Sequence, residues 1–149
     1  MRQLKNVNEM SHDFNIGVIS VVFDGNELNG NSAKHRFTAI LRSSRKLKEV
    51  SLRRCMLEDD GLHAVFAEFT PLQGLKKLDL SENGITDRGL DSIDEFIGAH
   101  KKTQLKSINL SYNAITTPSL IKFLKAIEAR NNTIKELNFS FNNLQNDAA

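Results

Sequence analysis

The stretch LKKLDLSENGI, from Leu75 to Ile85, returns thirty residues later as LKSINLSYNAI, from Leu105 to Ile115. Both stretches carry apolar residues at positions 1, 4, 6 and 11 and an asparagine at position 9, although most other letters differ. The same pattern, with a small hydrogen-bonding residue at position 9, fits three more stretches that begin at residues 18, 47 and 134. The five starts are spaced by 29, 28, 30 and 29 residues. So regular a period predicts a repeat architecture.

Each repeat is predicted to hold a short strand followed by a helix. The apolar residues at repeat positions 4 and 6 follow the two-residue period of a strand. Repeat positions 16, 19 and 23 are mostly apolar, at the spacing of one helix face. Typical helix starts precede them, namely Thr86 with Asp87, and Thr116 followed closely by Pro118. Repeat position 15 is small in four repeats, where it holds Ser32, Gly61, Gly89 and Ser119.

These residues resemble the leucine-rich repeat family, in its ribonuclease-inhibitor-like class, and the resemblance covers nearly the whole chain. It implies an α/β solenoid in a horseshoe arc, with a parallel sheet on the concave side and helices on the convex side. It also implies that the side chain at repeat position 9 points inward and bonds to the backbone of a neighbouring turn. The residues expected in this structural ladder are Asn26, Cys55, Asn83, Asn113 and Asn142. Because the family tolerates cysteine there, Cys55 is interpreted as structural rather than nucleophilic or metal-binding.

We expect one leucine-rich repeat domain over residues 1–149. Residues 1–17 are expected to form the helix of a preceding half-repeat, because Leu4, Val7 and Met10 fall on repeat positions 16, 19 and 22. The last repeat is expected to be incomplete, since Ala149 falls where the next helix would begin. This favours a fragment of a longer protein over a last strand edge that is covered by a second copy or a partner.

Composition argues for a soluble intracellular protein. The chain has 149 residues, of which 40% are apolar and 26% charged, and its formal net charge of +2 suggests neither a polyanionic partner nor an acidic tail. No apolar run approaches the roughly 18 residues that read as a membrane-spanning helix, and no signal-peptide stretch opens the chain. With Cys55 as its single cysteine, the chain forms no internal disulfide. We therefore expect a cytoplasmic location.

No catalytic constellation is found, so we expect neither an enzyme nor a cofactor or metal site. The four histidines lie in different repeats without the spacing of a metal site, and they are His12, His35, His63 and His100. The stretch DGNELNGNS, residues 24–32, lacks the spacing of a phosphate-binding loop and is typical of a turn. Glu58, Asp59 and Asp60 are interpreted as a solvated helix start rather than a calcium site.

Binding is expected on residues that the core does not need, at repeat positions 3, 5, 7 and 8. The predicted partner-binding residues on the concave face and its edge are Arg53, Arg54, Asp79, Ser81, Glu82, Asn109, Ser111, Tyr112, Asn138 and Phe141. Tyr112 and Phe141 should be neighbours on an exposed edge, where aromatic residues are typical of binding hot spots. The alternative is that Phe141 covers the last strand. Arg53 and Arg54 are expected opposite Asp79 and Glu82, either as mutually neutralising pairs or as a charged binding face.

The stretch LRSSRKLKEVSLRR, residues 41–54, is strongly basic. Its cations are Arg42, Arg45, Lys46, Lys48, Arg53 and Arg54. Such a patch suits the phosphates of a nucleic acid or an anionic membrane. Because it runs from a helix end through a turn to a strand, its charges should spread over several faces. A solvated surface is therefore favoured, and neither nucleic acid nor membrane is an expected partner.

The function expected from the resemblance is a non-catalytic protein–protein interaction module that binds a partner on its concave face. One alternative is a GTPase-activating protein similar to those of Ran, although the loop residues and acidic tail of that class are not located here. A second is a cytoskeletal regulator similar to tropomodulin, whose terminal helix is missing. A third, suggested by the asparagine content, is a bacterial or protist effector that acts in a host cytosol. Self-association through the uncapped C-terminal strand is also considered.

Overall fold

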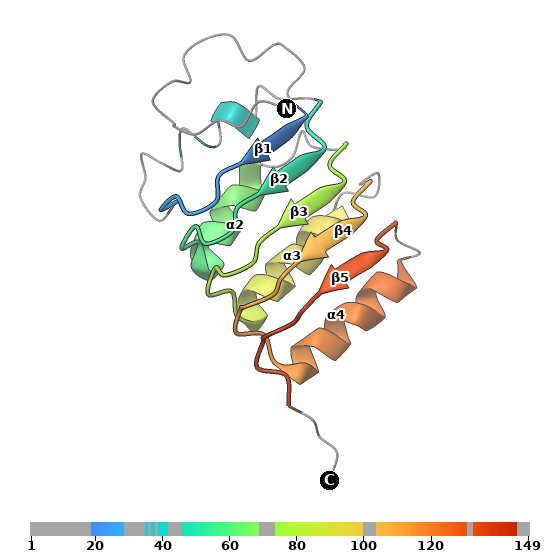
Figure 1. The fold of residues 1–149 in the computed structure, drawn as a ribbon. Coiled ribbons are helices and arrows are strands. Elements are labelled where there is room, and N and C mark those ends of the chain that lie inside the picture. The colour runs from blue at the N-terminus through green and yellow to red at the C-terminus, as the bar shows by residue number, and fades with distance from the viewer. Residues whose placement is uncertain are drawn as a thin grey trace.

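The computed structural model describes residues 19–28, 35, 37, 39–41, 46–68, 74–99, 104–130 and 133–145. Its strands are β1 (Ser20–Val22), β2 (Glu49–Ser51), β3 (Lys77–Asp79), β4 (Ser107–Asn109) and β5 (Glu136–Asn138). Its helices are α2 (Glu58–Glu68), α3 (Asp87–Ala99) and α4 (Thr117–Ala129). Within these residues, the strands form one parallel sheet in the order β1-β2-β3-β4-β5 (Figure 1).

Each strand occupies positions 3 to 5 of its repeat. In the sheet, Ser20 lies opposite Glu49, which is followed across the strands by Lys77, Ser107 and Glu136. Residues with the same repeat position are therefore neighbours on adjacent strands, about 4.8 Å apart. One repeat adds one strand and one helix, which confirms the predicted α/β leucine-rich repeat solenoid.

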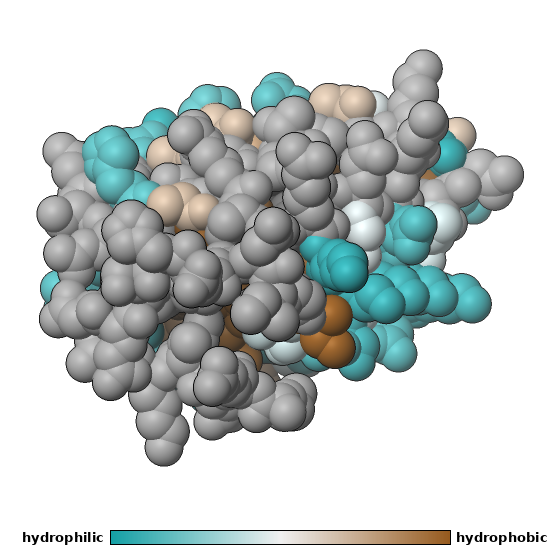
Figure 2. All heavy atoms as spheres, turned by 90° about the horizontal axis from the view of Figure 1, so that it is seen from above, coloured by the Kyte–Doolittle hydropathy of each residue, from teal (hydrophilic) through white to brown (hydrophobic). Residues whose placement is uncertain are grey.

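The helices α2, α3 and α4 all cover one face of the sheet and leave the other face open (Figure 1). Side chains at repeat position 4 point into the layer between sheet and helices, where Val50, Leu78 and Ile108 are each at most 2% exposed. Burying each such side chain contributes on the order of 2 kcal/mol. The surface seen from above is mainly hydrophilic in its described part, with a small hydrophobic patch between the polar side chains (Figure 2).

Asn83 shows how repeat position 9 joins consecutive repeats. Its Oδ1 accepts hydrogen bonds from the backbone N–H groups of Cys55 (2.9 Å) and Leu57 (3.3 Å) in the preceding repeat. Its Nδ2 donates to the carbonyl oxygens of Leu52 (2.7 Å) and Ser81 (3.0 Å). A side chain that satisfies four backbone groups inside the protein holds two turns in a fixed relation.

The other residues at repeat position 9 make related contacts. Asn113 Oδ1 accepts the N–H groups of Asn83 and Ile85, each at 3.0 Å. Asn142 Oδ1 accepts the Ile115 N–H at 3.0 Å. The Cys55 thiol donates to the carbonyl oxygen of Phe23 at 3.3 Å, and Asn26 Nδ2 donates to the same carbonyl at 2.6 Å. Position 9 is thus a row of hydrogen-bonding groups that face inward from Cys55 to Asn142, whereas Asn26 is exposed and bonds within its own repeat.

A second row of contacts joins the helix starts and was not anticipated. Asp59 accepts the Thr86 N–H at 2.9 Å through Oδ1 and the Thr86 hydroxyl at 2.6 Å through Oδ2. Asp87 accepts the same two groups of Thr116, at 2.8 and 2.7 Å. Asp59 is therefore a structural group, 9% exposed, rather than a solvated acid at a helix start. Thr116 precedes α4 without capping it, because its hydroxyl is donated to Asp87 instead.

The backbone after each strand enters the left-handed region at repeat position 8. The residues there are Gly25 (φ 75°), Arg54 (53°), Glu82 (56°), Tyr112 (56°) and Phe141 (58°). Residues other than glycine rarely adopt this backbone conformation. The turn is therefore imposed by the stacked repeats and not by the residue that occupies it.

Some expectations fall on other parts of the chain. The helix predicted within residues 1–17, the start of a further helix near Ala149, and Ser32 all lie outside the described residues. So do His12, His100, Arg42 and Arg45. Within the described residues, no helix combines the length and apolar character needed to cross a bilayer.

Candidate binding surface

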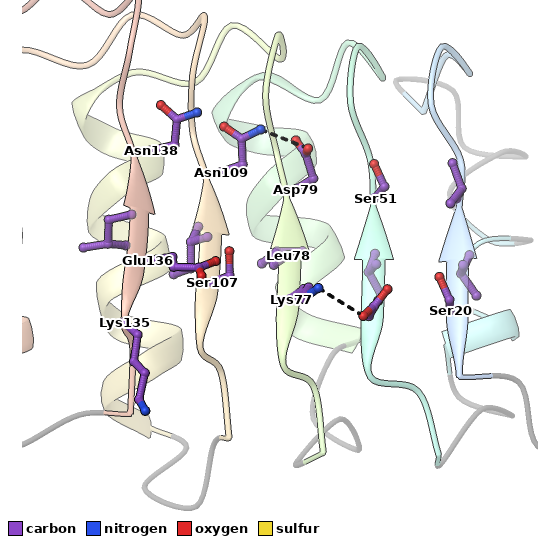
Figure 3. A pocket seen from close by; sticks show the side chains of 16 residues that line it. Ser20, Ser51, Lys77, Leu78, Asp79, Ser107, Asn109, Lys135, Glu136 and Asn138 are labelled. Carbon is purple, nitrogen blue, oxygen red and sulfur yellow. Dashed lines mark hydrogen bonds and ion pairs between the residues drawn. The ribbon is translucent and has the colours of Figure 1, made fainter.

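The open face of the sheet carries a hollow of about 710 Å³ that is lined by residues of all five described strands (Figure 3). Polar side chains at repeat positions 3 and 5 face this hollow. Those labelled in Figure 3 include Ser20, Ser51, Lys77, Asp79, Ser107, Asn109, Glu136 and Asn138. The predicted binding residues at position 5, namely Asp79, Asn109 and Asn138, are thus brought together on one face.

The side chains at repeat position 5 also shape the turn that follows. Asp79 Oδ1 accepts the Ser81 N–H at 2.9 Å and the Ser81 hydroxyl at 2.6 Å. Asn109 Oδ1 accepts the Ser111 N–H at 3.1 Å, and its Nδ2 donates to Asp79 Oδ2 at 3.0 Å (Figure 3). Side-chain bonds to the backbone two residues on are typical of Asx turns. The side chains of Asp79, Asn109 and Asn138, called the polar row below, are therefore fixed in position by the fold itself.

The burial of Ser81 and Ser111 corrects the prediction for both residues. Both serines were expected to project from the sheet, but Ser81 is 2% exposed and Ser111 is 7% exposed. Asp79 Oδ1 accepts both the N–H and the hydroxyl of Ser81, so the polar groups of this serine are already used within the fold. Neither serine therefore offers a side chain to a partner on the exposed surface.

The arginines at the edge of the sheet share one carboxylate. Arg53 Nε donates to Glu82 Oε1 at 2.6 Å, and Arg54 donates to Glu82 Oε2 through Nε (2.8 Å) and a terminal nitrogen (2.6 Å). Asp79 was expected to take part, but its oxygens are occupied by Ser81 and Asn109. Sequence spacing placed the four charges near one another without revealing that a single acid would take both arginines.

This cluster is electrostatically coupled although its two arginines are exposed. Hydrogen bonds from Arg54 and Arg53 lower the pKa of the Glu82 carboxyl, and the bond to Glu82 raises the pKa of Arg53. Exposed ion pairs contribute little to stability because water and salt screen them. Asp79 and Asp24 also lie close enough to raise the pKa of Arg53, so nearby acids balance the charge of the two arginines.

Tyr112 and Phe141 form a stacked aromatic pair at repeat position 8. Their ring centroids are 4.3 Å apart and their planes differ by 11°. Tyr112 is 52% exposed and Phe141 is 70% exposed. Phe141 therefore stacks one face of its ring on Tyr112 and leaves most of its surface open to solvent. Two large aromatic surfaces thus stand next to each other at the edge of the open face.

Cys55 has the properties of a packing residue. Its side chain is 0% exposed, and burial raises the pKa of the thiol from 9.0 to about 11. A thiol that keeps its proton at neutral pH is a poor nucleophile and metal ligand. No group of three or more histidine, cysteine or acidic side chains arranged to hold a metal ion occurs among the residues that the structure describes.

Comparison with known families supports the repeat architecture. A family model described as Leucine Rich repeat matches residues 73–93, 101–124 and 130–149, which cover much of the repeats that begin at residues 75, 105 and 134. Domains of this kind generally mediate protein–protein interactions and are typically non-catalytic. The ribonuclease-inhibitor-like class stays a prediction from the repeat length. None of the curated proteins compared with the chain matches it.

Proposed function

Because the chain is a leucine-rich repeat protein, we propose that it is a non-catalytic module that binds an extended segment of a partner protein across the open face of its sheet. The stacked pair of Tyr112 and Phe141 is the observation that carries this proposal. Repeat solenoids use their extended inner surfaces for such contacts. The polar row at position 5 would meet the backbone of the segment, and the aromatic pair would anchor its side chains.

The aromatic pair is not explained by the needs of the fold. Other repeats place Gly25, Arg54 and Glu82 at the same position with a similar backbone. A left-handed φ costs an L-residue roughly 1 kcal/mol or more, which glycine avoids. Rings that are exposed and held in an unfavourable backbone conformation add little to folding. Exposed aromatic groups of this kind dominate many protein interfaces.

The polar row has hydrogen-bonding capacity left for a partner. Asn138 Oδ1 accepts the Ser140 N–H at 3.0 Å, while its Nδ2 has no acceptor among the described residues. Asn138 is exposed and lies beside Asn109 in the sheet. Amide groups that are fixed on one side and open on the other are suited to bonding the N–H and C=O groups of an extended peptide.

The proposal is tested by replacing both rings with alanine, Tyr112→Ala together with Phe141→Ala. The matched control is Lys122→Ala together with Lys125→Ala on exposed positions of α4, which lies on the opposite face. Partners captured by the wild type are identified by mass spectrometry and then measured one at a time for affinity. We expect the ring variant to bind about tenfold more weakly or worse, the control to bind normally, and both to melt at nearly the wild-type temperature.

Two results would contradict the proposal. Unchanged affinity of the ring variant would remove the aromatic pair from the interface. A large fall in melting temperature would show instead that the rings belong to the fold. The conservative change Phe141→Tyr keeps the stacked surface, so it should preserve both the capture of the partner and the affinity for it.

A further inference from the structure

Lysine occupies repeat position 2 in four consecutive repeats, immediately before β2, β3, β4 and β5. The residues of this lysine row are Lys48, Lys76, Lys106 and Lys135. Their backbones are linked directly, since the N–H of Lys76 donates to Lys48 O (2.7 Å), that of Lys106 to Lys76 O (2.8 Å) and that of Lys135 to Lys106 O (2.8 Å). The four lysines therefore lie in one line along the N-terminal ends of the strands, with their backbones about 4.8 Å apart, and each carries a cationic side chain.

The lysine row is not neutralised by the residues around it. Lys48, Lys106 and Lys135 are exposed and Lys76 is half-buried. None of the four forms an ion pair with an acidic residue in the described part of the chain, where the neighbouring Lys77 pairs with Glu49 at 3.5 Å. Like charges at this spacing repel one another. The first described repeat has Ile19 at the same position, so the fold does not require a lysine there.

We propose that the lysine row binds an acidic, extended peptide segment of a partner protein that lies across the strands. Three steps of about 4.8 Å give the row a backbone length of about 14 Å, which four or five residues of extended peptide would cover at about 3.3 Å per residue. A run of aspartate or glutamate residues supplies negative charge at that density. Its carboxylates relieve the repulsion along the row and form charge-assisted hydrogen bonds with the ammonium groups.

The surroundings of the row favour a peptide over a nucleic acid or a membrane. Glu49 and Glu136 stand at repeat position 3, next to the row, and Asp79 lies further along the open face. A broad polyanionic surface would have to approach these carboxylates as well as the lysines. A single extended peptide is narrow enough to contact the row alone. The net charge of +2 also provides little long-range attraction for a large polyanion.

This surface is separate from the aromatic pair. The lysine row precedes the strands at position 2, whereas Tyr112 and Phe141 follow them at position 8. The variant Tyr112→Ala with Phe141→Ala should therefore bind an acidic peptide as the wild type does. Failure of one proposal leaves the other standing.

The test uses a fluorescent octaglutamate peptide and measures its affinity by anisotropy at about 50 mM salt. The variant Lys76→Gln with Lys106→Gln removes two charges from the centre of the row. The control Lys122→Gln with Lys125→Gln removes two charges from α4, so both proteins have the same net charge. We expect the row variant to bind about fivefold more weakly, the control to bind as the wild type does, and about 500 mM salt to abolish binding.

A second variant guards against a folding effect at the half-buried Lys76. Lys48→Gln with Lys135→Gln changes two exposed ends of the row and should weaken binding to a similar extent. The proposal is overturned if octaglutamate does not bind, if neither row variant weakens it, or if the α4 control weakens it equally. It is also overturned if octathymidylate or phosphatidylserine vesicles bind more tightly through the same lysines, because the row would then serve a different polyanion.

Discussion

The helices α3 and α4 have the same length of 13 residues and follow each other in the stack, yet they are buried very differently. α3 buries Gly89, Leu90, Ile93, Phe96 and Ile97, whereas α4 buries Phe123 alone. Leu120 and Ile127 occupy the same repeat positions as Leu90 and Ile97 but are only partly buried.

The difference arises from neighbours rather than from sequence. α3 lies between α2 and α4, while α4 has a described helix on one side (Figure 1). Its apolar residues Ile121 and Leu124 are 47% and 42% exposed. A leucine-rich repeat is therefore stabilised by what is stacked on it, as expected for an array whose stability is a sum over adjacent units. Whether a second copy can cover this end of the stack is measurable by light scattering over a concentration series.

Truncating one leucine in each helix should give the largest contrast. We expect Leu90→Ala to cost about 3 kcal/mol of unfolding free energy, because it leaves a cavity between sheet and helices, and Leu120→Ala to cost about half of that. Both values come from denaturant unfolding of the two variants. Equal losses would mean that α4 is as well packed in solution as α3.

Asparagine at repeat position 9 offers a polar version of the same comparison. Asn83 is 2% exposed and satisfies four backbone groups, while Asn142 is half-buried. Asn83→Ala should cost about 2–3 kcal/mol, since it strands buried donors and acceptors, and Asn142→Ala about 1 kcal/mol because water replaces its bonds. Urea midpoints of the two variants test this order, and a larger loss at Asn142 would reverse it.

Because the Cys55 thiol is buried, the free energy of unfolding should depend on pH. Between pH 9 and about 11 the unfolded chain loses the thiol proton while the folded chain retains it, because burial raises the folded pKa to about 11. The unfolded state then binds fewer protons, so stability falls as pH rises through this window, by about 3 kcal/mol in total. Below pH 9 this contribution is constant.

The measurement is the difference in unfolding free energy between the wild type and Cys55→Ala at several pH values. Other titrating groups are common to both proteins and cancel in that difference. A difference that does not change with pH between 9 and 11 would show that the thiol is accessible to solvent in the folded protein.

Two glycines at repeat position 15 should give a smaller effect with opposite signs. A Cβ at Gly89 would collide with Asp59 Oδ1 and lie 2.6 Å from Ile85 Cγ2, whereas one at Gly61 meets Leu57 Cβ at an ordinary 3.5 Å. We expect Gly89→Ala to destabilise by about 1–2 kcal/mol. Gly61→Ala should stabilise by about 0.5–1 kcal/mol, since alanine favours the helix. Thermal melting distinguishes them, and the same sign for both would contradict the role of Asp59.

The repeat period predicted the architecture because residues at one repeat position have the same structural environment in successive repeats. Strands lie at positions 3 to 5 of every described repeat, centred on the apolar residue at position 4. The family resemblance added the inward-facing row at position 9, which neither hydrophobic period nor propensity reveals. Periodicity therefore carries the fold, since burial at one position recurs in each repeat.

The surface was harder to predict because it depends on contacts between repeats. Ser81 is buried and bonds to Asp79 through both its N–H and its hydroxyl, which the repeat pattern does not reveal. The bonds from Thr86 to Asp59 require knowing that helix starts of adjacent repeats touch. The lysine row is visible in the sequence at position 2, but a repeated exposed charge looks the same there as an ordinary solvated surface.

The left-handed turn at repeat position 8 accepts very different residues, so the surface at the C-terminal ends of the strands can be changed by substitution. Glycine, arginine, glutamate, tyrosine and phenylalanine all occupy it in successive described repeats with φ between 53° and 75°. The backbone conformation thus does not depend on which residue occupies this position, and each residue presents different chemical groups to solvent. A combinatorial library varied at Gly25, Arg54, Glu82, Tyr112 and Phe141 would change what the edge recognises while the stack beneath it keeps its shape.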